Sequence, residues 1–261
     1  MTWTEAAPAF ARNPVVLVPM GSIEQHGPHT PVGDYRYMTE VCRKIAEKTE
    51  AIVAPTIPWG YSDAFEAFPG TLTLRPETLK NLVLDVLDGF LRHGLDHIVL
   101  VCGHKGNMAA LEQVAREVKK THGVRLVTIE PLTWNDTAMR KELYQTDTPP
   151  TGHGSDPMCS IAIELFPDDV RMDLAEEGHP YRFWDLPLKG GGQASFEGYP
   201  VTLYTDYNEI APNGVIGDPF IADAEVGRRI VEHIVSVGIR FVEWFKEQDT
   251  SYEPVESVKA D

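Results

Sequence analysis

Residues 15–29 read VVLVPMGSIEQHGPH, an apolar run that passes directly into a loop of glycine and polar side chains. The run at 15–19 has the length and composition of a buried strand. Further apolar runs predict strands at residues 51–55, 97–102 and 124–129, and segments with helical spacing lie at 36–48, 76–92 and 108–121. Continuously apolar strands separated by helices are typical of a parallel sheet covered on both faces. The sequence therefore predicts an α/β fold with a mostly parallel sheet.

The second half of the chain is less regular. Residues 130–155 are polar, and residues 178–219, which contain three consecutive glycines, predict loops with short strands. Helices are expected at about residues 156–165 and 222–247. Because no repeat and no linker divides the chain, we expect a single domain over residues 1–261, of which 250–261 form a flexible tail.

The composition excludes several classes of function. A formal net charge of −16 makes nucleic acid and anionic membranes unsuitable partners, because no excess of basic side chains would neutralise their phosphates. No apolar stretch is long enough to span a membrane, and the N-terminus lacks the regions of a signal peptide. Cys42, Cys102 and Cys159 are widely spaced and form no CxxC pair, which favours a reducing compartment. We therefore expect a cytoplasmic globular protein.

The loop after the first strand carries the densest group of polar residues. Residues i and i+2 of an extended segment point the same way, so Glu24 and His26 can present an oxygen and a nitrogen to one point. Asp34 follows in the same loop, where it is placed either to join them or to cap the helix that begins near Tyr35. A carboxylate with an imidazole is a common ligand set for zinc, manganese or iron. Although such residues are often only solvated in loops, the flanking glycine and proline indicate a shaped backbone.

Two more histidines lie between small residues. His104 follows the strand at 97–102, and as a ligand it would meet the first loop, because parallel strands end at the same edge of a sheet. Its alternative role is that of a capping or core histidine. His153 lies between two glycines before a helix and is suited to general acid or base catalysis. Asp156 is placed either to bind a metal or to cap that helix.

Several of these segments resemble a known family. GSIEQHGPH at residues 21–29 resembles the signature loop of the creatininase (creatinine amidohydrolase) family. Three further segments are similar to that family's in the same order, namely FPGT at 68–71, GHKGN at 103–107 and GVIGDP at 214–219. The resemblance implies a three-layer α/β/α fold, often assembled as a homohexamer, with two divalent metals (zinc, manganese or iron) that hydrolyse a C–N bond.

The resemblance also implies roles for individual residues. Glu24 and His104 would bind one metal and His26 the other, an aspartate would bridge the two, and His153 matches the catalytic histidine. Counted without gaps, the bridging aspartate falls on Tyr35, and a loop shorter by one residue returns that role to Asp34.

The sequence departs from the family at two further positions. Gly106 stands where creatininase itself has a carboxylate, and Met158 stands where most relatives have a glutamate. Asp156 lies near enough to substitute as a metal ligand.

The expected substrate is a small amide, with a cyclic amide as the first candidate. Metal-activated water would attack the carbonyl carbon, and His153 would deliver a proton to the leaving nitrogen. Trp59 and Tyr61 are expected to line the pocket, unless they belong to the core, and Lys105 is placed either to meet a substrate carboxylate or to remain solvated. The alternatives are an open-chain amide or formamide hydrolase, and a metal-poor relative with a structural role.

Overall fold

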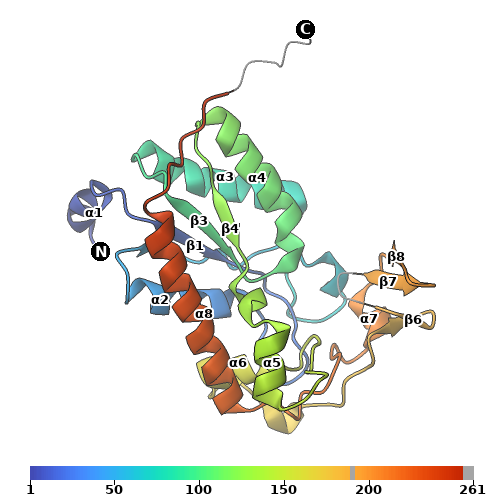
Figure 1. Ribbon diagram of the computed structural model, residues 1–261. Coiled ribbons are helices and arrows are strands. Elements are labelled where there is room, and N and C mark those ends of the chain that lie inside the picture. Colours follow the sequence, from blue (N-terminus) through green and yellow to red (C-terminus); the bar gives the residue numbers. More distant parts are fainter. Residues whose placement is uncertain (189–191, 255–261) are drawn as a thin grey trace.

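The central sheet has four parallel strands (Figure 1). The computed structural model describes residues 1–188 and 192–254. The strands lie in the order β2-β1-β3-β4, and their bounds are Val16–Met20 for β1, Ile52–Val53 for β2, Ile98–Cys102 for β3 and Val127–Ile129 for β4. Each neighbouring pair is parallel, which confirms the predicted sheet.

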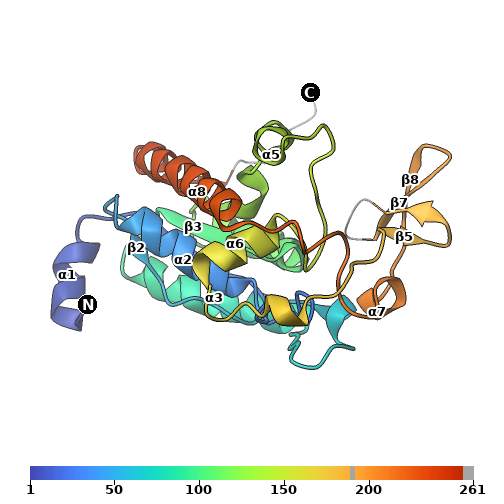
Figure 2. The same ribbon diagram turned by 90° about the horizontal axis from the view of Figure 1, so that it is seen from below.

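Helices cover both faces of this sheet (Figure 2). One layer contains α3 (Pro76–Arg92) and α4 (Met108–Thr121), and the other contains α2 (Tyr35–Ala46), α6 (Met158–Leu165) and α8 (Ala224–Phe245). Alternate residues of β1 pack into these two layers, because side chains of a strand point to opposite faces in turn. Val16 and Val18 face α3 and α4, whereas Leu17 faces α2 and α8. The expected three-layer α/β/α fold is therefore confirmed.

The predicted elements agree with the structure more closely for the helices than for the edge strands. The expected strand at 51–55 retains two residues as β2, beyond which Pro55 has no N–H to donate to a neighbour. The expected strand at 124–129 retains three as β4, because Val124 pairs instead with Ser251 near the C-terminus.

Besides the four-residue α7 (Tyr207–Ile210), two helices were not predicted. These are α1 (Trp3–Phe10) and α5 (Thr137–Tyr144), the second of which lies within the stretch interpreted as a polar loop. Both are short, and each is fixed by a capping side chain, Thr2 for α1 and Asp136 for α5. Since α5 has no fully buried residue, it lacks the apolar stripe by which a helix is found in a sequence.

The excursion, which we define as residues 178–217, leaves the sheet and contains the expected short strands. They form two antiparallel pairs, and a one-turn helix follows: β5 (Arg182–Phe183) with β6 (Leu186–Pro187), β7 (Gln193–Phe196) with β8 (Tyr199–Thr202), and α7 (Tyr207–Ile210). Four 3₁₀ turns complete the described elements: η1 (Asp63–Phe65), η2 (Lys105–Asn107), η3 (Pro131–Trp134) and η4 (Met172–Leu174). Two of the three glycines expected in a loop, Gly190 and Gly191, lie outside the described residues.

The chain beyond α8 is held against the sheet layer at first. Thr250 is buried, its carbonyl accepts a hydrogen bond from the amide of Arg125, and the amide of Tyr252 donates to the carbonyl of Gly123. Residues 255–261, most of the expected tail, lie outside the described residues. Within residues 1–188 and 192–254, no helix combines the length and the apolar character that a bilayer span requires.

The closest helix contact joins α8 to α6 through a glycine. A methyl group on Gly227 would overlap the backbone carbonyl oxygen of Ser160 in α6. Gly89 in α3 is the matched opposite case, because a methyl group there would have no other atom within 4 Å. Substitution of alanine at each of these two glycines therefore distinguishes the effect of helix propensity from the effect of helix packing.

We expect Gly89→Ala to raise the free energy of unfolding by about 0.5–1 kcal/mol, since alanine loses less backbone entropy in a helix. Gly227→Ala should instead lower it by about 1–3 kcal/mol, because the two helices must move apart. Urea denaturation followed by circular dichroism measures both changes. Equal effects of the two substitutions would contradict the close packing of α8 on α6.

Candidate active site

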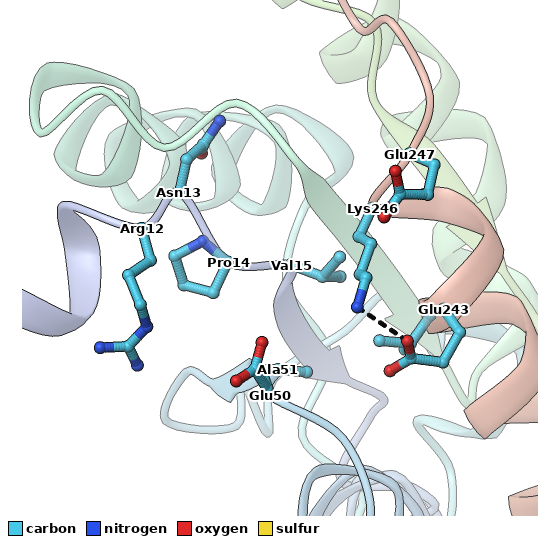
Figure 3. A pocket seen from close by; sticks show the side chains of 10 residues that line it. Arg12, Asn13, Pro14, Val15, Glu50, Ala51, Glu243, Lys246 and Glu247 are labelled. Carbon is cyan, nitrogen blue, oxygen red and sulfur yellow. Dashed lines mark ion pairs between the residues drawn. The ribbon is translucent and has the colours of Figure 1, made fainter.

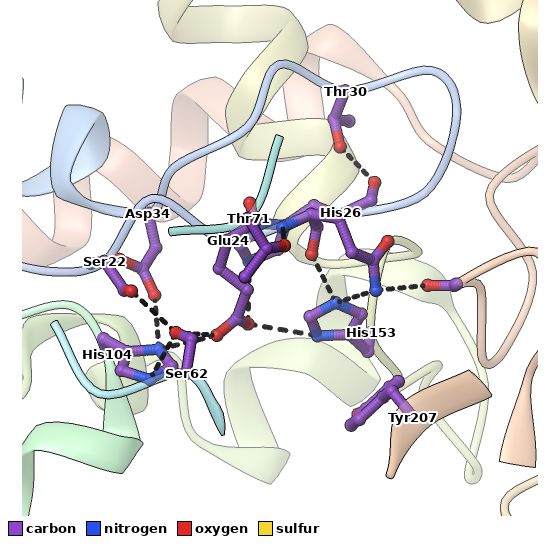
Figure 4. A network of polar contacts seen from close by, with 12 residues as sticks. Ser22, Glu24, His26, Thr30, Asp34, Ser62, Thr71, His104, His153 and Tyr207 are labelled. Atoms are coloured by element: carbon purple, nitrogen blue, oxygen red, sulfur yellow. Dashed lines mark hydrogen bonds and ion pairs between the residues drawn. The ribbon is translucent and has the colours of Figure 1, made fainter. Parts of the chain in front are cut away.

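The polar loops meet at the carboxyl edge of the sheet, as the parallel arrangement predicts. β1 and β3 are neighbours, with Met20 opposite Cys102, so the loops that follow them start side by side. Glu24 comes from the first loop and His104 from the second, and Glu24 Oε2 lies 3.1 Å from His104 Nδ1 (Figure 4). His153 approaches from the segment before α6, which pairs with the excursion at Ile216.

The first cluster consists of Glu24, Asp34 and His104, all buried. His104 Nδ1 lies 2.9 Å from Asp34 Oδ2, and its Nε2 donates to the carbonyl oxygen of Tyr61 at 2.7 Å. This second contact leaves Nδ1 facing the two carboxylates, which is the arrangement of a metal-ligating histidine whose other nitrogen is held by a carbonyl.

The electrostatics of this cluster favour a cation. Burial opposes a charge on His104, but the carboxylates of Glu24 and Asp34 outweigh it and raise the pKa of His104 to about 9. Burial likewise raises the pKa of Glu24, and His104 and His26 oppose that shift. Two carboxylates taken out of water require a compensating positive charge. A proton on His104 supplies it, and a divalent cation among the same oxygen and nitrogen donors would supply it equally.

Asp34 turns toward this cluster despite its one-residue offset. Its Oδ1 accepts a hydrogen bond from the amide of Ser22, and its side chain makes no capping bond to α2. The alternative helix-capping role is therefore contradicted. Gly21 permits the close approach, because a Cβ there would overlap Asp34 Oδ1.

The second cluster consists of Glu24, His26 and His153. Glu24 Oε1 lies 3.9 Å from His26 Nε2 and 3.8 Å from His153 Nδ1. The other nitrogen of each ring lies next to a backbone carbonyl, at 3.1 Å from the oxygen of Glu24 for His26 and 2.7 Å from that of Gln25 for His153. Donation to these carbonyls leaves a lone pair on each nitrogen that faces Glu24.

Glu24 is the carboxylate common to both clusters. The resemblance gave this place to an aspartate, but Asp34 belongs to the first cluster alone, because Ser22 and His104 engage its two oxygens. The two oxygens of Glu24 instead face different histidines, Oε1 toward His26 and His153 and Oε2 toward His104.

The two positions without the family's carboxylate have different surroundings. A side chain on Gly106 would overlap the carbonyl oxygen of Tyr61 and press on the His104 ring, so no residue larger than glycine fits this backbone. Met158 is the first residue of α6 and packs against the core on the α2 and α8 side of the sheet.

Asp156 was expected as a substitute ligand, and this role stays a prediction. It belongs to neither cluster, and both of its oxygens are already engaged. Oδ1 accepts from the amide of Ser160, and Oδ2 accepts from the hydroxyls of Tyr144 and Ser160 at 2.7 and 2.6 Å. Asp156 thus holds the first turn of α6 through Ser160, although the N-cap residue of that helix is Pro157.

Three residues of the site were not predicted. The Ser62 hydroxyl lies 2.7 Å from Glu24 Oε2 and 2.6 Å from the Ser22 hydroxyl. The ring of His153 lies between those of His26 and Phe65, with 4.7 Å between centroids on each side, and Phe65 stacks on Tyr207 at 4.1 Å. Ser62, Phe65 and Tyr207 carry no signal in the sequence, because each reaches the site from a segment outside the loops that follow β1 and β3.

The expected substrate-binding residues lie around the His104 loop. Tyr61 contributes its backbone, whose carbonyl accepts from His104 and whose amide donates to Asn107 Oδ1. Trp59 is 46% exposed and therefore does not belong to the core. Lys105 is exposed at the start of η2. Their contacts with a substrate stay predictions.

A hollow at the opposite edge of the sheet lacks comparable chemistry (Figure 3). It lies beside Val15, before β1 begins, and one ion pair crosses it, between Lys246 and Glu243 at 2.9 Å. Its lining residues include no histidine and no cysteine: Arg12, Asn13, Pro14, Val15, Glu50, Ala51, Val242, Glu243, Lys246 and Glu247. The candidate active site is therefore the group of side chains at the carboxyl edge of the sheet.

Known proteins resemble this chain along most of its length. The creatinine amidohydrolase of Pseudomonas putida is 30% identical over 205 residues, which cover 70% of this chain and 76% of that protein. The mycofactocin precursor peptide peptidase of Mycobacterium tuberculosis is 28% identical and covers 91% of this chain and 88% of its own length. The 3-dehydro-scyllo-inosose hydrolase of Thermotoga maritima is 25% identical, with coverages of 90% and 78%.

Solved structures and a family profile agree with these relatives. A mutant creatininase of Zn–Zn type superposes with a TM-score of 0.77 at 26% identity, covering 94% of this chain and 96% of that one. Creatininase with Mn gives a TM-score of 0.76 at the same identity and coverage. The profile of the creatininase family, described as creatinine amidohydrolase, matches residues 1–242. This chain therefore belongs to the creatininase family of hydrolases.

Proposed function

We propose that this protein is a metal-dependent hydrolase that cleaves the C–N bond of a small amide, with a cyclic amide as the first candidate. The observation that carries the proposal is the position of the Glu24 carboxylate, buried between three imidazole rings. Mixed carboxylate and imidazole donors suit zinc, manganese and iron. Relatives described as Zn–Zn type creatininase and creatininase with Mn support the first two.

The donors divide between two ions. Glu24, Asp34 and His104 would hold one ion, and Glu24 with His26 would hold the second. Bound there, divalent metals lower the pKa of a water molecule and polarise an amide carbonyl. The ion site next to His104 has the better support. The Ser62 hydroxyl donates to Glu24, and the Tyr61 carbonyl accepts from His104, so both proposed ligands are held in position.

His153 is the residue proposed for proton transfer. With its Nε2 donating to the carbonyl of Gln25, Nδ1 keeps a lone pair that can accept the proton of the attacking water and return it to the leaving nitrogen. Burial, together with the nearby His26, holds the pKa of His153 well below its usual value, so the ring begins uncharged. Lys105, exposed beside His104, is proposed to meet a carboxylate of the substrate.

Other functions remain as alternatives with a clear discriminating measurement. A peptidase and a 3-dehydro-scyllo-inosose hydrolase among the relatives show that the family's site serves different substrates. Open-chain amides and formamides are therefore the second substrate class to test. A metal-poor structural relative would copurify with no transition metal, whereas the enzyme should carry at least one per chain. The hexameric assembly and the cytoplasmic location stay predictions.

Exhaustive chelation should abolish the hydrolysis of whichever amide is found by screening cyclic and linear compounds, and added zinc or manganese should restore it. The reason is that water at neutral pH is a poor nucleophile without a metal to lower its pKa. Elemental analysis beside each assay verifies the metal content. Full activity in a sample shown to be metal-free would exclude a metal-dependent mechanism.

Glu24→Gln should weaken the binding of both ions by at least about 100-fold, because Glu24 faces both clusters and even supporting residues cost 10–100-fold. Asp34→Asn should weaken only the ion next to His104. Calorimetric titration of the metal-stripped variants with zinc measures the number and affinity of sites. If Asp34→Asn loses both ions and Glu24→Gln only one, the bridging role belongs to Asp34.

His153→Phe should lower kcat by about 10²–10⁴-fold, the usual contribution of general acid–base catalysis, while metal content stays unchanged. Phenylalanine keeps a ring between His26 and Phe65 and removes both nitrogens. Circular dichroism and elemental analysis serve as controls. A parallel loss of one metal per chain would make His153 a ligand in place of a proton carrier.

A further inference from the structure

Hydrolysis of an amide places negative charge on the carbonyl oxygen, and a fixed N–H or O–H donor stabilises that charge strongly in a dry site. Tyr207 brings such a group to the site from far along the sequence. Its ring lies 4.6 Å from that of His153 and stacks on Phe65 (Figure 4). Phe65 in turn stacks on His153, so the three rings form one continuous packed group.

The backbone holds Tyr207 in this position. It is the first residue of α7, and a capping box joins Asp206 and Glu209 across that turn. The amide of Ala211, which is fully buried, donates to the carbonyl of Tyr207 at 2.7 Å. The excursion itself is tied to the segment of His153, because His153 and His179 both pair with Ile216. The phenol is therefore presented by a fixed turn beside the proposed proton carrier.

The hydroxyl of Tyr207 has one recorded partner, the hydroxyl of Tyr181 at 3.2 Å. A pair of hydroxyls shares one hydrogen bond, so one of the two protons is not used within the pair. When Tyr181 donates, the proton of Tyr207 is free for a third group. Among residues 1–188 and 192–254, no side chain or carbonyl accepts it.

The phenol stays protonated under neutral conditions. Burial raises the pKa of Tyr207 well above its usual value, and Tyr181 and the Glu24 carboxylate act in the same direction. A group whose pKa is raised keeps its proton at every pH below that value.

We infer that the Tyr207 hydroxyl donates a hydrogen bond to the carbonyl oxygen of the amide held beside His153, with Tyr181 orienting that hydroxyl from behind. The inference rests on the proposed function and supplies an uncharged donor at the site. It also gives the excursion a role, because α7 lies outside the sheet and yet contributes a group to the reaction.

Matched phenylalanine variants test this inference. Tyr207→Phe keeps the ring stack on Phe65 and removes only the hydroxyl, so kcat should fall by about 10²-fold, as when one oxyanion donor is deleted. The metal content and the far-ultraviolet circular dichroism should change little. Tyr181→Phe should cost much less, because Tyr207 still has its proton. Unchanged kcat in Tyr207→Phe, or an equal loss in Tyr181→Phe, would overturn the assignment.

A binding measurement separates this inference from the proposed function. Acetohydroxamate is a small amide analogue with a carbonyl oxygen, and calorimetry measures its affinity for the metal-loaded protein without any turnover. Tyr207→Phe should bind it about tenfold more weakly than the natural chain, the usual scale of one lost hydrogen bond. Equal affinities would refute the donor.

The same probe identifies which idea fails. If the natural chain binds acetohydroxamate but hydrolyses no amide, the proposed function fails, and the affinity of Tyr207→Phe alone decides the inference. If the natural chain neither binds nor hydrolyses, both are overturned.

Discussion

The carboxylate of Glu24 is buried at the meeting point of three loops, and a charge removed from water must be compensated by its neighbours. His104 lies against one of its oxygens, and His26 and His153 face the other. His104 reaches it because β1 and β3 are parallel neighbours whose loops leave from the same edge. The three layers of the fold can thus be understood as the scaffold that keeps this buried charge and its partners in register.

The sequence predicted the parts of the structure that depend on periodicity. The apolar strands gave the parallel sheet, and the sheet in turn placed Glu24 next to His104, although 79 positions in the chain separate the two. Asp34 turns toward His104 as expected, but Glu24 and not Asp34 is the carboxylate common to the two clusters. The contributions of Ser62 and Phe65 could not be predicted, since contacts between irregular segments leave no repeating pattern. The hydrogen bonds of Asp156 to Ser160 are local contacts that no periodicity predicts.

The two clusters differ in how firmly they are built. The first has two carboxylates and a histidine, and Ser22, Ser62 and a carbonyl hold them. The second shares Glu24 and otherwise offers only the imidazoles of His26 and His153. A common core of ligands with such variation at its border agrees with a family whose members act on different substrates.

The edges of the sheet have a consequence beyond catalysis. The outer strands, β2 and β4, contain two and three residues, whereas the inner strands β1 and β3 contain five each. Unpaired backbone at a sheet edge is a template on which another chain can add a strand. Val124, three residues before β4, pairs with Ser251 of the same chain. Short outer strands of this kind leave little unpaired backbone for edge-to-edge association.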